Sequence, residues 1–90
     1  MYDFDKKIKA LTDGSFFVTF NRNRYLLSKK THLGGKLIKL YAEELGGNDF
    51  VSLNYYPQIQ GGLLKPCEMS QEKVIDFILK IQVNVPVRDS

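Results

Sequence analysis

The chain has few residues that could act as a nucleophile, and the most conspicuous is its single cysteine, Cys67. Cys67 lies just before a predicted helix that begins after Ser70, and the N-terminus of a helix can favour the reactive thiolate. The neighbouring Glu68 opposes thiolate formation, and free cysteine is among the most buried residue types. We therefore expect Cys67 to be a small apolar filler that points into the core. The alternative, a reactive thiol, would make the chain a one-cysteine redox protein.

The only histidine, His32, would have to serve any Ser-His-Asp or Cys-His device, and a site with several histidine ligands is impossible. His32 lies close to the Gly34-Gly35 pair, where we expect a solvated loop. Neither this pair nor Gly46-Gly47 belongs to a phosphate-binding motif. Because no nucleophile and base can be paired, we predict that the chain is not an enzyme and uses no cofactor or metal.

Basic and aromatic residues alternate along the predicted strands and suggest a binding surface. Residues 1–39 carry nine Lys/Arg and three Asp/Glu, whereas residues 40–90 carry four and seven. Aromatic rings can stack on bases while basic groups contact phosphates, as in sheets that bind single-stranded nucleic acid. Packing alone also favours tyrosine in strands. The candidate binding surface, expected on the sheet face opposite the helix, consists of Arg22, Arg24, Tyr25, Lys39, Tyr41, Tyr55 and Tyr56.

Length and composition limit the folds that the chain can adopt. Ninety residues, 43% hydrophobic and 26% charged, predict a single domain over residues 1–90 with one core. A lone cysteine cannot form an intramolecular disulfide, which suits a reducing compartment. The first residues are acidic where a secretion signal would be basic, and no run approaches the roughly twenty apolar residues of a membrane span. We therefore expect a cytoplasmic protein with no membrane partner.

Apolar residues alternate with period two from Ser15 onward, which predicts an antiparallel β-meander. We expect strands within 7–11 and over 15–20, 24–29, 36–41 and 50–56, with Leu63-Leu64 as a short last piece. Turns are expected at Asp13-Gly14, at 21–23, in a loop over 31–35 and at 46–49. Residues 36–45 are ambiguous between strand and helix. A strand ending at Tyr41 is preferred, because the lysines and glutamates of this segment lie at the wrong ends for a helix dipole.

The clearest predicted element is a C-terminal helix from Gln71 to Gln82, with Ser70 as its N-cap. An apolar stripe at i, i+3, i+4 and i+7 would face the sheet. This stripe consists of Val74, Phe77, Ile78 and Ile81. Residues 84–90 are expected to be a flexible tail. The predicted fold class is α+β, a four- or five-stranded antiparallel β-meander with one C-terminal α-helix packed on one face.

Four segments carry a resemblance to known sequences. They read LYAEELGGNDF (40–50), NYY (54–56), LLKPCEMS (63–70) and KVIDF (73–77). With these segments the chain resembles a family of small uncharacterised bacterial proteins. The resemblance implies a bacterial cytoplasmic protein and identifies no catalytic residue.

These observations predict a small non-enzymatic binding or protein-interaction module. A single short helix would leave Phe17, Leu26 and Leu37 uncovered on the far face of the sheet, so we expect a protein partner or a second copy of the chain in a homodimer. Weak nucleic-acid binding through the candidate binding surface is the first alternative, and the redox protein is the second.

Overall fold

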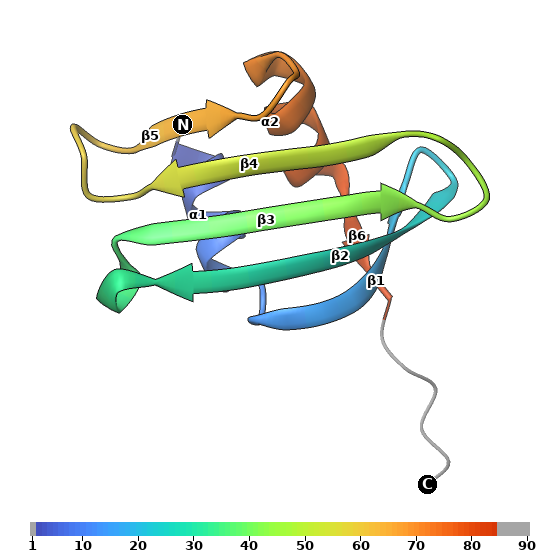
Figure 1. Ribbon diagram of the computed structural model, residues 1–90, viewed down its shortest axis with the longest axis horizontal. Coiled ribbons are helices and arrows are strands. Elements are labelled where there is room, and N and C mark those ends of the chain that lie inside the picture. Colours follow the sequence, from blue (N-terminus) through green and yellow to red (C-terminus); the bar gives the residue numbers. More distant parts are fainter. Residues whose placement is uncertain (1, 85–90) are drawn as a thin grey trace, which may run out of the picture.

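Two helices cover one face of an antiparallel sheet and leave the other face open (Figure 1). The computed structural model describes residues 2–84. Within them the chain forms α1 (Tyr2–Ala10), β1 (Gly14–Phe20), β2 (Asn23–His32), the 3-10 turn η1 (Leu33–Gly35), β3 (Leu37–Glu44), β4 (Phe50–Tyr56), β5 (Leu63–Pro66), α2 (Gln71–Lys80) and β6 (Gln82–Val83). In Figure 1 both helices lie behind the sheet, so the viewer faces its open side.

The described strands are ordered β5-β4-β3-β2-β1-β6, and all neighbours are antiparallel. Strands β1 to β5 follow one another as the predicted meander, and the α+β class with a C-terminal helix on the sheet is confirmed. The prediction missed a second helix and a sixth strand. That strand, β6, is two residues long and pairs with Val18 and Thr19 at the outer edge of β1.

The predicted strand within residues 7–11 is wrong, because this segment belongs to helix α1 and the turn that follows it. Phe4, Ile8 and Leu11 recur at i, i+4 and i+7 and are all buried against the sheet. Charges also suit the helix dipole, with acids in the first turn and lysines in the last. These charged residues are Asp3, Asp5, Lys7 and Lys9.

The ambiguous segment 36–45 forms a strand, as preferred, but β3 continues past Tyr41 to Glu44. Strand β2 also runs further than expected. It continues through Thr31 to His32, so the loop predicted over 31–35 is shortened to the turn η1. The hairpin turn between β1 and β2 is confirmed, with left-handed φ values of 49° at Asn21 and 69° at Arg22.

Helix α2 begins where it was predicted and ends two residues earlier, at Lys80. The Ser70 hydroxyl accepts a hydrogen bond from the Lys73 amide at 3.1 Å, which confirms the N-cap. At the other end Lys7 of α1 donates to the carbonyls of Leu79 and Ile81, at 3.1 and 2.6 Å. The predicted stripe is buried against the sheet. Its members are Val74, Phe77, Ile78 and Ile81.

A buried lysine fastens α1 to the sheet. Lys29 of β2 is only 3% exposed, and its amino group donates to the carbonyls of Lys9 and Leu11 at the end of α1. The Asp13 carboxylate lies 3.7 Å away. Burial lowers the pKa of Lys29, and the nearby Asp13 charge opposes that shift. The lysine therefore satisfies carbonyls that a helix C-terminus leaves without partners.

A buried tyrosine joins α1 to β4. The Tyr55 hydroxyl donates to Asp5 at 2.6 Å, and the Tyr55 ring meets Phe4 edge to face with centroids 5.1 Å apart. Gly62 passes so close that a Cβ atom there would lie 2.2 Å from the hydroxyl. Burial alone would raise the pKa of Asp5, but the hydrogen bonds from Tyr55 and Lys9 outweigh it and lower that pKa.

Asn84 is the last described residue and is tied to β1. Its amide donates to the Phe17 carbonyl at 3.0 Å, and its side-chain oxygen accepts from Thr19 at 3.0 Å. The remainder of the predicted flexible tail, residues 85–90, lies outside the described residues. None of the helices within residues 2–84 is both long enough and apolar enough to span a membrane.

Truncation of Phe77 should test how α2 contributes to the core. Phe77 is fully buried, with ring centroids 5.0 Å from Phe20 and 5.1 Å from Tyr25. We expect Phe77→Ala to lower the free energy of unfolding in urea by about 3–5 kcal/mol, because it leaves a cavity. Leu79→Ala on the same helix is the control, since Leu79 is 43% exposed, and should cost less than about 1 kcal/mol. A loss below about 1 kcal/mol in Phe77→Ala as well would show that α2 is peripheral.

The Asp5–Tyr55 hydrogen bond should make stability depend on pH. Because folding lowers the pKa of Asp5, its contribution is present above the unfolded pKa of about 3.9 and is lost as the pH falls through the folded value. We expect Asp5→Asn to lower the free energy of unfolding by about 1 kcal/mol at neutral pH and to flatten its fall between about pH 5 and pH 2. Asp3→Asn, in the same turn, is the control for the loss of one carboxylate from α1. An unaltered profile in Asp5→Asn would contradict the assignment.

Candidate functional site

The sheet face turned away from the helices, here called the open face, carries the candidate site. Strand register sorts its side chains into rows that run across the strands. In one row Lys30 of β2 is opposite Lys39 of β3, which is opposite Asn54 of β4, which is opposite Lys65 of β5. We call these four residues the lysine row. Three cations thus cross the face in a single line.

The lysine row is an unfavourable arrangement for the fold alone. Like charges directly opposite each other on neighbouring strands destabilise a sheet. Lys30, Lys39 and Lys65 are all exposed, and none of them forms an ion pair with any residue in the described part of the chain. Their charges are therefore available to a ligand.

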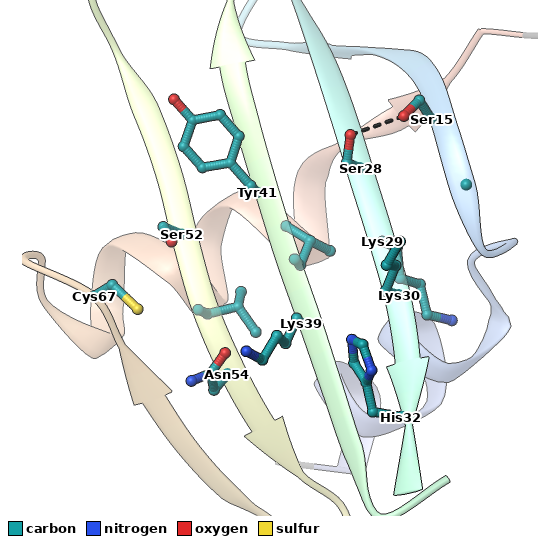
Figure 2. A pocket seen from close by; sticks show the side chains of 13 residues that line it. Ser15, Ser28, Lys29, Lys30, His32, Lys39, Tyr41, Ser52, Asn54 and Cys67 are labelled. Atoms are coloured by element: carbon teal, nitrogen blue, oxygen red, sulfur yellow. Dashed lines mark hydrogen bonds between the residues drawn. The ribbon is translucent and has the colours of Figure 1, made fainter. Parts of the chain in front are cut away.

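The next row, called the serine row, has short side chains around one large ring. It consists of Ser15, Ser28, Tyr41, Ser52 and Cys67. The Ser15 and Ser28 hydroxyls lie 2.8 Å apart and share a hydrogen bond (Figure 2). Tyr41 stands out from the row, is 46% exposed and stacks on Phe50, with ring centroids 6.3 Å apart and planes at 27°.

A hollow of about 500 Å³ lies over the lysine row and the serine row. Figure 2 shows Tyr41 toward one end and His32 toward the other, with the Lys39 amine directed at Asn54. Its volume is within the range of ordinary ligand sites. Most of the residues that line it carry a hydroxyl, amide, amino or imidazole group. The hollow therefore suits a polar or charged ligand.

A third row, called the apolar row, lies beyond the serine row. It consists of Phe17, Leu26, Glu43 and Phe50. Phe17 is 42% exposed, and the Arg24 guanidinium lies 4.8 Å from the centre of its ring. Glu43 is the one carboxylate that the described strands place in these three rows. The open face thus changes from cationic to apolar across the serine row.

The predicted binding surface is wrong for Tyr25 and Tyr55, which are 2% and 0% exposed on the helix-covered face. Tyr25 is in phase with the buried Leu27, and its hydroxyl donates to Asp49 at 2.7 Å. Burial raises the pKa of both tyrosines, and the hydrogen-bonded carboxylates reinforce the shift. None of the other five predicted residues lies on the helix-covered face. Arg24, Lys39, Tyr41 and Tyr56 are on the open face, and Arg22 is in the β1–β2 turn.

The expectation that Cys67 fills the core is also wrong, because its thiol is exposed and lines the hollow. The Cys67 amide donates to the Ser52 carbonyl at 2.9 Å, so the strand pairing of β5 extends by one residue. Alternation then directs Leu64 inward and Cys67 outward. His32 is likewise part of β2 rather than a loop residue.

The site contains several residues that sequence patterns did not single out. They are Ser28, Lys30, Ser52, Asn54 and Lys65. No three His, Cys, Asp or Glu side chains gather into a metal-binding group anywhere in residues 2–84. Comparison of the chain with protein-family models, with curated proteins and with solved structures gives no match.

Alkylation should distinguish an exposed thiol from a buried one. We expect iodoacetamide to label Cys67 in the folded protein at a rate close to that of the urea-denatured protein, because the side chain is exposed. Cys67→Ser should change the free energy of unfolding by less than about 0.5 kcal/mol. Strong protection of the thiol, together with a destabilised serine variant, would restore the packing role.

Proposed function

We propose that the chain is a non-enzymatic binding module whose open face holds a negatively charged partner. The lysine row carries this proposal. Three exposed lysines share one line across the sheet without a carboxylate partner among the described residues, and two of them, Lys30 and Lys39, line a hollow. A negative partner would neutralise the row and convert its repulsion into attraction.

Protection against aggregation does not account for these lysines. Exposed lysine on an edge strand deters the pairing of one sheet with another. Lys65 is on the edge strand β5, so this explanation could apply to it. Lys30 and Lys39, however, are on β2 and β3, the two central strands, where both edges of each strand are already paired. Their placement on central strands therefore supports a role in binding.

The arrangement of the two most reactive side chains supports a role without catalysis. His32 and Cys67 both line the hollow, but they are on β2 and at the end of β5. Three steps between neighbouring strands separate them, which is about 14 Å. A histidine must come within hydrogen-bond distance of a thiol to act as its base. The two residues are too far apart for this.

The charge of the open face also disfavours self-association through it. Each copy would bring four cations, Arg24, Lys30, Lys39 and Lys65, against Glu43, the one carboxylate that the described strands place in the three rows. Burying these groups together would leave most of them without a counter-charge. An acidic partner supplies the charge that a second copy lacks.

A matched pair of variants should test the proposal, with inorganic polyphosphate as the probe. We expect Lys30→Gln/Lys39→Gln/Lys65→Gln to weaken polyphosphate binding about tenfold or more and to make it less sensitive to salt, because the row's charges are lost. The control is Lys6→Gln/Lys9→Gln/Lys80→Gln, which removes the same net charge from exposed positions on the two helices, on the other side of the sheet.

The two triple variants separate a specific face from general basicity. Equal weakening in both would show that polyphosphate responds only to net charge, and the proposal would fail. Amide chemical-shift changes in the wild-type protein should gather on β2 to β5 at the lysine row and be absent from α1 and α2.

A further inference from the structure

We infer that the negatively charged partner is a single-stranded nucleic acid, with its backbone on the lysine row and an unpaired base against Tyr41. The inference rests on the proposed function, since it names the partner of the same face. It depends on the order of the rows, on the Tyr41–Phe50 ring pair and on the position of Glu43.

Rows of unlike chemistry lie side by side on the open face. The lysine row is cationic and the apolar row is mostly apolar, while the serine row between them carries mainly hydroxyls and a thiol. A single strand of nucleic acid has the same asymmetry, with phosphates along one side and flat rings along the other. Binding of this kind combines a cationic groove with aromatic stacking surfaces.

Tyr41 is placed as a stacking surface for a base. Its ring is 46% exposed, borders the hollow, and is held from behind by Phe50 at 6.3 Å. Lys39 is two residues earlier on the same face of β3, so the two side chains start about 7 Å apart. One nucleotide can therefore place its base on Tyr41 and its phosphate near Lys39.

Glu43 gives the bound strand one orientation. It lies two residues beyond Tyr41 on β3, on the side away from Lys39. A carboxylate there repels phosphate but can accept hydrogen bonds from the edge of a base. The backbone is thus favoured over the lysine row and the bases over the serine and apolar rows.

Other anionic partners would use less of this face. Polyphosphate and acidic peptides without rings can engage the lysines but leave Tyr41 and the apolar row without a role. In a duplex the bases are stacked on one another, so none is free for Tyr41. Of these partners, only an unpaired strand engages both the lysine row and Tyr41.

Binding of labelled octamers of thymidine (DNA) and uridine (RNA) should test the inference, with polyphosphate of matched length as the reference anion. We expect Tyr41→Thr to weaken binding of the oligonucleotides about tenfold, because stacking on the ring is lost, and to leave polyphosphate binding unchanged. Tyr41→Phe, which keeps a ring, should bind as the wild type does. Tyr56→Thr is the control, since Tyr56 is on the same face at the far side of the lysine row.

The outcomes separate this inference from the proposed function. Equal effects of Tyr41→Thr on oligonucleotides and polyphosphate, or no effect on either, would overturn the nucleic-acid partner while leaving the lysine-dependent anion site intact. Failure of both octamers to bind would also overturn it. If the Lys30/Lys39/Lys65 triple variant bound both the oligonucleotides and polyphosphate as tightly as the wild type, the proposed function would be overturned as well. Binding of one octamer and not the other supports the inference and identifies the partner as DNA or RNA.

Discussion

The helices cover only one face of the sheet, and the rest of the structure depends on how firmly they hold it. Helices of nine and ten residues are too short to be stable by themselves, so their stability comes from packing. Phe4 and Ile8 of α1 and Phe77 of α2 bury apolar area on the same side of the strands. Lys7 and Lys29 then supply donors to the two helix C-termini. With one face thus closed, the other is free to carry polar groups.

Neighbouring lysines on β2 show how strand alternation separates a lysine that holds the fold from one that faces the open side. Lys29 points to the helix side and is hydrogen-bonded at the end of α1, whereas Lys30 points to the open face without an ion pair in the described chain. A register slip of one residue would exchange the two faces. Lys30 would then be buried without the carbonyl partners that Lys29 has, and Lys29 would lose its contact with α1. The packing that fixes the register therefore also fixes the position of the lysine row.

Much of the fold follows from sequence patterns, and the errors have identifiable causes. Strand β4 and the start of α2 were predicted correctly because alternation and a helix cap are local signals. Helix α1 was missed although its charges obey the dipole rule that was applied to residues 36–45. Tyr25 and Tyr55 were misplaced because each is adjacent in a strand to another predicted member, Arg24 or Tyr56, and neighbouring residues of a strand point to opposite faces. Carboxylates on other elements satisfy both buried hydroxyls. The direction of the Cys67 side chain depends on a hydrogen bond to Ser52, which is distant in the sequence, so no local pattern predicts it.

The lysine row could have been predicted from the sequence, because residues equidistant from a hairpin turn pair across it. Lys30 and Lys39 are equidistant from Gly34-Gly35, and Lys39 and Asn54 are equidistant from Gly46-Gly47. What the sequence did not supply was the reason to compare them. Lysine and asparagine are both depleted in strands, yet this row places them together in the middle of the sheet. Repulsion and poor strand propensity both act against the fold at these positions. The buried helix face supplies the stability that tolerates them, which is consistent with the binding role proposed for the open face. A surface that only had to remain dissolved would not need its cations opposite one another.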